Sequence, residues 1–140
     1  AALDDGIHQL RAYLTRRMDS APDGEARVRE WLAGMLAQAL HPAGAAATRP
    51  FALARARLAE QFPGEVEKSE TQLSALLRDA LEQAVAEGSL PASDPARDAR
   101  ALYDLALGWM QRALAAQPST LAADAEALLA FAMGGLRRGA

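Results

Sequence analysis

Apolar side chains recur every three or four positions along nearly the whole chain, with polar side chains between them. This spacing aligns the apolar side chains on one face of an α-helix. No stretch of useful length alternates apolar and polar residues as a half-buried strand would. The pattern therefore predicts an all-α fold.

Turn and capping residues divide this pattern into six predicted helices. Gly88 supplies a left-handed stop, and Asp94-Pro95 combines a cap with a proline. Proline suits a first helical position because an N–H there would have no helical partner, so the N–H that proline lacks is not missed. The predicted helices run from about 2 to 19, from 23 to 41, from 48 to 62, from beyond 64 to about 87, from 95 to about 116 and from 118 to 136.

The predicted fifth helix differs from the others in the width of its apolar face. At about 100° per residue its apolar arc covers more than half the circumference, centred on the small residues Ala99, Ala106 and Ala113. One interpretation is a central helix buried within its own subunit. The interpretation we favour is that one flank packs internally while the other, together with the sixth helix, meets a symmetry mate in a twofold four-helix bundle. The predicted dimer interface comprises Leu102, Leu105, Trp109, Leu121, Ala125, Leu128, Ala132 and Leu136.

Two charged residues interrupt otherwise apolar stripes. Arg55 falls between Phe51, Ala59 and Phe62 on the predicted buried face of the third helix, and Glu70 falls on the apolar face of the fourth. Because an unpaired buried charge is costly, these residues either pair with each other, reach solvent at helix ends or line the polar part of a cavity.

Composition and charge narrow the class of protein. With 140 residues and 51% hydrophobic side chains, the chain is long enough for one core in a single domain over residues 1–140. No apolar run approaches the roughly 18 to 20 residues that a membrane helix needs, and no signal peptide is evident. The formal net charge of −3 disfavours a surface that binds nucleic acid by itself. We therefore expect a cytoplasmic domain that contacts neither membrane nor DNA directly.

Signals for catalysis are thin. The chain has no cysteine and only two histidines, His8 and His41, without the spacing of a helical metal site. The serines lie in predicted caps and turns. We therefore predict no catalytic residue, no metal site and no cofactor, and we interpret both histidines as surface or helix-end residues.

Four segments carry a resemblance to a known family. They read R-P-F-A-L-A-R-A-R-L-A-E-Q-F-P over residues 49–63, L-L-R-D-A-L-E-Q-A-V-A-E-G-S-L over 76–90, D-P-A-R-D-A-R-A-L-Y-D-L-A-L-G-W over 94–109 and A-D-A-E-A-L-L-A-F-A-M-G-G-L over 123–136. Together they resemble the C-terminal domain of TetR-family transcriptional regulators, in which a long helix ends at Glu-Gly and a proline-capped helix follows. The resemblance covers essentially the whole chain.

This resemblance implies an effector-binding and dimerising domain. The family reads DNA through an N-terminal helix-turn-helix domain of about 50 residues, which nothing here matches. The first helix looks like the one that links the two domains, so we expect DNA binding only through a missing N-terminal domain. The family places a small-molecule pocket among the middle helices, and such a pocket needs apolar walls with a few polar groups. The predicted ligand-binding residues are Trp31, Met35, Phe51, Arg55, Phe62, Leu77, Tyr103 and Met110.

Two other functions are compatible with this sequence. One is a helical dimerisation module with a filled core and no effector, which would differ from the favoured function only in lacking a pocket. The other is a helical-bundle enzyme or carrier, which would need clustered titratable groups in its core.

Overall fold

The computed structural model describes residues 2–41, 49, 54–116 and 119–139, and every regular element within them is an α-helix. The all-α prediction is therefore confirmed for these residues. None of the described helices is both long enough and apolar enough to cross a bilayer. The helices are α1 (Ala2–Asp19), α2 (Gly24–Leu40), α4 (Pro63–Glu87), α5 (Pro95–Ala116) and α6 (Leu121–Arg138), with helical residues 54–61 before α4.

The helix ends follow from local capping chemistry. The Asp23 carboxylate accepts a hydrogen bond of 2.8 Å from the backbone N–H of Ala26 and so satisfies a donor in the first turn of α2. Gly88 ends α4 with φ of 79°, a left-handed conformation that glycine adopts without strain. Before α5, Asp94 accepts a hydrogen bond from the backbone N–H of Arg97 at 3.2 Å. These boundaries agree with the predicted ones.

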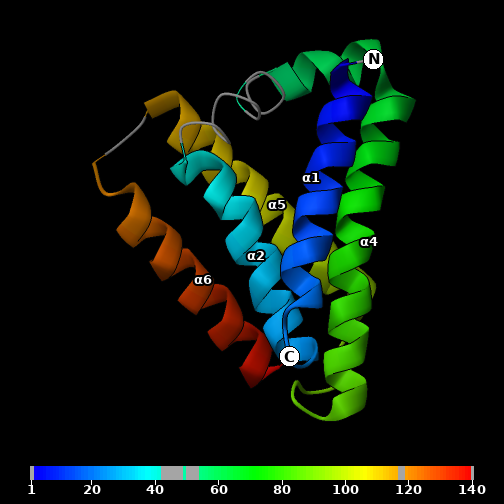
Figure 1. The fold of residues 1–140 in the computed structure, drawn as a ribbon, viewed down its shortest axis with the longest axis vertical. Coiled ribbons are helices and arrows are strands. Elements are labelled where there is room, and N and C mark those ends of the chain that lie inside the picture. Colours follow the sequence, from blue (N-terminus) through cyan, green and yellow to red (C-terminus); the bar gives the residue numbers. More distant parts are fainter. Residues whose placement is uncertain (1, 42–48, 50–53, 117–118, 140) are drawn as a thin grey trace.

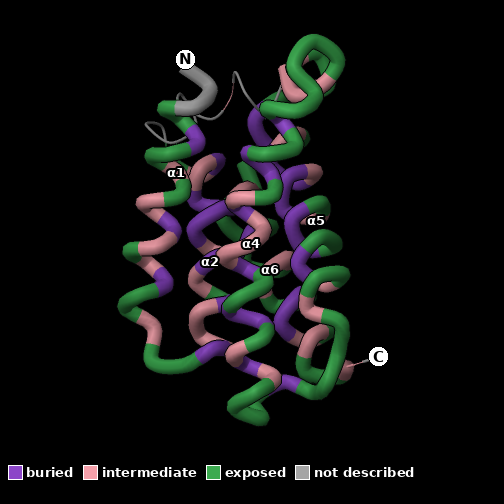
Figure 2. Tube along the Cα trace, turned by 90° about the vertical axis from the view of Figure 1, so that its right-hand side faces the viewer, coloured by how far each residue is buried: buried purple, intermediate pink, exposed green. Residues whose placement is uncertain are grey.

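α2 is the central helix of the bundle. It contacts α1, α4, α5 and α6, and α6 lies on the opposite side of α2 from α4 (Figure 1). The buried stretches of these helices face the interior, and the outer turns are exposed (Figure 2). A glycine allows α2 to pack closely on α4. Gly24, at the start of α2, lies directly against the backbone of Gln83 and Ala84 in α4.

The broad apolar arc of α5 is covered within one subunit. Leu102 and Trp109 on one flank are 7% and 9% exposed, and Tyr103 and Leu107 on the other flank are also buried. Both α2 and α4 pack on α5. The sequence argument that this arc is too wide for its own subunit is therefore wrong, because it did not anticipate two neighbouring helices on α5.

Candidate functional site

Most of the predicted ligand-binding residues come together in the core between α2, α4 and α5. Trp31, Leu77 and Met110 are completely or almost completely buried, and so are Met35 and Tyr103. The predicted ligand residue Phe51 lies outside the described residues. For these five buried residues the sequence pattern predicted a place in the shared interior.

Phe62 does not belong to this cluster, which corrects its predicted position. Its side chain is 47% exposed. The backbone at Phe62 has φ of −135° and ψ of 60°, outside the helical region, between helical residues 61 and 63. The helical register that was expected to bury Phe62 therefore breaks at this residue, one position before α4 begins.

Arg55 and Glu70 form a partly buried ion pair. The Arg55 Nε donates to Glu70 Oε2 at 2.9 Å, and Arg55 Nη2 donates to Glu70 Oε1 at 2.7 Å. This bidentate geometry is the strongest arrangement available to a guanidinium and a carboxylate. The Glu70 side chain is only 4% exposed and the Arg55 side chain 27%. Of the three alternatives that the sequence left open, direct pairing is the one found in the structure.

Tyr103 extends this pair into the core. Its hydroxyl hydrogen-bonds to Glu70, while burial, followed by the charge of Glu70, raises the pKa of Tyr103 well above the ordinary tyrosine value. The hydrogen bonds from Arg55 to Glu70 likewise raise the pKa of the guanidinium. Arg55, Glu70 and Tyr103, which we call the polar cluster, therefore hold a charged carboxylate, a charged guanidinium and a neutral phenol in an apolar surrounding.

Trp31 fixes the apolar wall beside the polar cluster. Its indole N–H donates to the carbonyl oxygen of Leu73 in α4 at 3.0 Å, so the buried donor is satisfied. The Trp31 and Tyr103 ring centroids lie 6.2 Å apart, with planes inclined by 50°. This is within the range of favourable aromatic pairs. The indole thus links α2 to α4 by a hydrogen bond and to α5 by ring packing.

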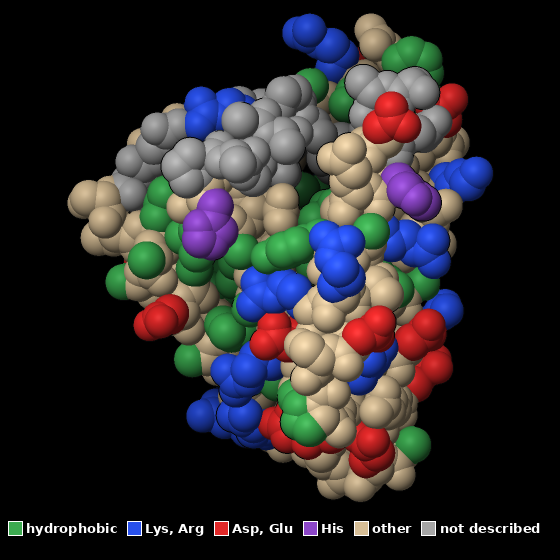
Figure 3. Space-filling view, viewed as in Figure 1, with side chains coloured by type: hydrophobic (Ala, Val, Ile, Leu, Met, Phe, Trp, Pro, Cys, Tyr) green, Lys and Arg blue, Asp and Glu red, His purple; other side chains and the backbone are tan. Residues whose placement is uncertain are grey.

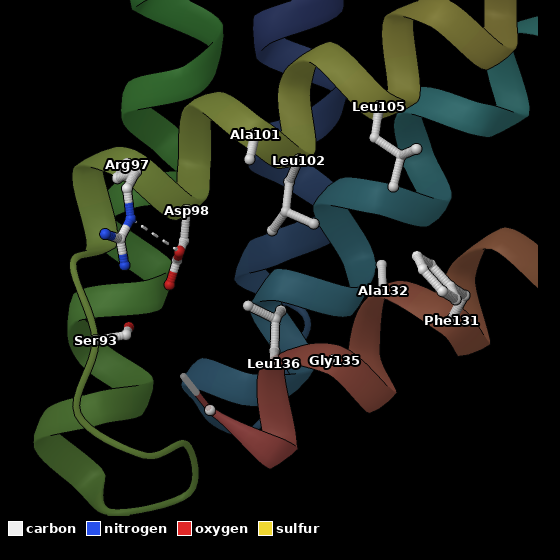
Figure 4. Close-up of a pocket in the computed structure, with 11 residues that line it drawn as sticks. Ser93, Arg97, Asp98, Ala101, Leu102, Leu105, Phe131, Ala132, Gly135 and Leu136 are labelled. Carbon is white, nitrogen blue, oxygen red and sulfur yellow. Dashed lines mark ion pairs between the residues drawn. The ribbon is translucent and has the colours of Figure 1, made fainter.

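A second feature is a groove between α5 and α6. It has a volume of about 280 Å³ and is lined mainly by apolar side chains (Figure 4). Leu102 of α5 and Leu136 of α6 point toward each other across it, and Arg97 and Asp98 lie paired at one end (Figure 4). Hydrophobic side chains also gather at the surface over α2 and α6 (Figure 3).

Four of the eight predicted interface residues line this groove, namely Leu102, Leu105, Ala132 and Leu136. Leu105, Leu121, Leu128 and Leu136 are half-buried and retain apolar surface. The remaining four are buried within the single chain and have little area left for a partner: Leu102, Trp109, Ala125 and Ala132.

Sequence reasoning missed the most exposed large apolar residue of the groove. Phe131 on α6 is 75% exposed and lies beside Ala132, facing the groove (Figure 4). The signal was present in the sequence, because Phe131 falls outside the α6 stripe that runs from Leu121 to Leu136. An aromatic residue off the core stripe of a surface helix is a candidate contact residue.

The histidines do not join either feature. His8 and His41 are both exposed, as expected for surface or helix-end residues. Within the described residues, no group of three or more histidine, aspartate or glutamate side chains is arranged to hold a metal ion.

No family model, no curated protein and no solved structure matches this chain.

Proposed function

We propose that this chain is a dimerising regulatory domain of the kind that its resemblance to TetR-family regulators implies. The observation that carries the proposal is the apolar groove between α5 and α6 with Phe131 exposed at its edge. Full burial of a phenylalanine side chain is favourable by roughly 1.5–3 kcal/mol, and a twofold dimer gains this contribution twice. A second copy is therefore the partner that we assign to this face.

In the proposed regulation, effector binding is coupled to DNA binding. A small effector would bind among the middle helices and favour one of two helix arrangements, and α1 would transmit the difference to an N-terminal DNA-binding domain. The effector acts only through its difference in affinity for the two arrangements. DNA contact belongs to that additional domain.

A second candidate function is a dimerisation module that has a filled core and binds no effector. The observation in its favour is that Trp31, Leu77 and Met110 are packed with almost no exposed surface. The polar cluster favours effector binding, because the partly exposed Arg55 presents a cation at the edge of an apolar core.

Sedimentation equilibrium of the full chain at micromolar concentration tests the proposed dimer. We expect twice the chain mass of 14.8 kDa. Phe131→Asp should raise the dimer dissociation constant by about 100-fold or more, without loss of helicity, because this side chain lies outside the core. Ala130→Asp, which places the same charge at an exposed neighbouring position, is the matched control. A compact monomer for the unmodified chain overturns the proposal.

An amphipathic anionic dye, anilinonaphthalene sulfonate, separates the two candidates. The titration is done with the Phe131→Asp variant, so that the groove contributes little to binding. Saturable binding that Arg55→Lys weakens, with unchanged stability, supports an effector site at the polar cluster, because lysine keeps the charge but not the bidentate geometry. If the dye shows no saturable binding, the filled-core module is supported.

A further inference from the structure

The exposed face of α6 carries a symmetric pattern of charge around Phe131. Asp124 lies seven residues before Phe131, and Arg138 lies seven residues after it. Since seven residues make nearly two helical turns, the three side chains lie on one face, with the charges about 10 Å on either side of the ring. All three are exposed.

The two charges are available to a partner. Asp124 accepts a hydrogen bond from its neighbour Thr120 at 2.8 Å and forms no ion pair among the described residues. Arg138 has neither a hydrogen bond nor an ion pair there. The adjacent Arg137 behaves differently, because its Nε donates to Glu25 of α2 at 2.6 Å and so ties α6 to its own subunit.

Helix electrostatics alone does not explain this arrangement. An acidic residue in the first turn and a basic residue in the last turn are both favoured by the helix dipole. That preference sets the ends at which the charges lie but not the face. Glu126, in the second turn of α6, lies on a different side of the helix, about 140° away from Phe131 at about 100° per residue.

We propose that two copies of the chain pair their α6 helices antiparallel, with the twofold axis passing beside Phe131. This inference rests on the proposed dimer and specifies its register. In an antiparallel pair centred on Phe131, each Asp124 faces the partner subunit's Arg138, and the two rings meet at the axis. A stripe with this pattern is complementary to itself only when the helices are antiparallel.

Small residues next to Phe131 make room for this contact. Ala127 and Gly135, one turn before and after Phe131, are exposed, and a methyl group placed on Gly135 would meet no neighbouring atom within 4 Å. In the proposed register each Gly135 faces the partner subunit's Ala127. The helices therefore approach closely, and each ring packs over the groove edge of the second copy.

Charge reversal tests the register. Asp124→Arg or Arg138→Asp creates like charges at both symmetric contacts, so each should raise the dimer dissociation constant by about ten-fold at low salt. Mixing these two variants should restore dimerisation, because the heterodimer pairs arginines only with aspartates. The double variant Asp124→Arg, Arg138→Asp should likewise dimerise as the unmodified chain does.

Glu126→Arg is the matched control, because it makes the same charge change on another side of the same helix. It should leave the dissociation constant unchanged. If the unmodified chain dimerises but Asp124→Arg has no more effect than Glu126→Arg, the register is overturned and the dimer stands. If the unmodified chain is monomeric, the dimer and the register both fail.

Cysteine cross-linking provides an independent measurement, because the chain has no cysteine of its own. A residue beside a twofold axis meets its own copy, and a disulfide needs Cβ atoms about 3.5–4.5 Å apart. Phe131→Cys should therefore form a covalent dimer under mild oxidation, and Ala130→Cys should not. Cross-linking at position 130 without cross-linking at position 131 would place the axis elsewhere on α6 and overturn the register.

Discussion

At the scale of single residues, the Glu70 carboxylate is the group whose environment matters most. It is buried in α4, accepts both donors of the Arg55 fork and is hydrogen-bonded to the Tyr103 hydroxyl. Burying a carboxylate is unfavourable, so its charge is tolerated only while these partners are in place. The ion pair therefore links helical residues 54–61 to α4.

Loss of one member of the ion pair should be strongly destabilising. We expect Arg55→Leu to lower the free energy of unfolding by about 2–4 kcal/mol, because it leaves the buried carboxylate without its countercharge. The double variant Arg55→Leu, Glu70→Leu should lower the free energy of unfolding by clearly less than the sum of the losses for Arg55→Leu alone and Glu70→Leu alone. Urea denaturation measures the free energy of unfolding of the unmodified chain, the two single variants and the double variant. Strict additivity would contradict an energetic coupling between the two side chains.

The Tyr103 hydroxyl predicts a dependence of stability on alkaline pH. Burial raises the pKa of Tyr103 above the ordinary value of 10.0. The folded state then keeps a proton that the unfolded state releases, so the stabilisation is complete below pH 10.0 and declines as the pH rises above it. Urea midpoints between pH 9 and 11 should fall less for Tyr103→Phe than for the unmodified chain. Equal slopes for the two proteins would show that Tyr103 is not the group responsible.

At the scale of helices, the start of α2 lies in close contact with the backbone near the end of α4. The backbone N–H of Gly24 donates to Glu87 Oε1 at 2.8 Å, so a side chain of α4 caps the first turn of α2. A methyl group on Gly24 would lie 2.7 Å from the Cα of Ala84, closer than real contacts allow. The absence of a side chain at Gly24 therefore sets the distance between these helices.

Substitution of Gly24 tests this contact. Gly24→Ala should lower the free energy of unfolding by about 1–3 kcal/mol, because α2 and α4 must separate to admit the methyl group. Gly6→Ala is the control, since Gly6 is an exposed position of α1 with no atom within 4 Å of the added methyl. That change should instead stabilise the chain by about 0.5–1 kcal/mol through helix propensity. Thermal denaturation compares the two, and a stable Gly24→Ala variant would exclude a tight backbone contact.

At the scale of the whole molecule, charged and apolar side chains are unevenly distributed over the face seen in Figure 3. Charged side chains crowd the view over α1 and α4, and hydrophobic side chains gather over α2 and α6 (Figure 3). The groove lies on the α6 side, away from the surface that α4 contributes. The proposed second copy and the polar cluster thus use different parts of the bundle.

The net charge predicts the behaviour of the chain toward DNA. Specific binding draws heavily on contacts between basic side chains and phosphates, whereas this chain has a formal net charge of −3. We expect the 140 residues alone to enrich no sequence from a random duplex pool at moderate salt. Fluorescence anisotropy on any enriched duplex provides the measurement. Nanomolar, sequence-specific binding would contradict the assignment of DNA contact to an additional domain.

The helices follow from the sequence alone, because their signals are local. Capping by Asp23, the left-handed Gly88 and the proline at the start of α5 act within one turn and do not depend on neighbours. The apolar stripes likewise identified most of the buried side chains. Long-range packing, in contrast, made α2 the central helix, paired Arg55 with Glu70, left Phe62 exposed and placed Phe131 beside a groove. Periodicity specifies the face that a helix buries, but the crossing of helices distant in sequence specifies what that face meets.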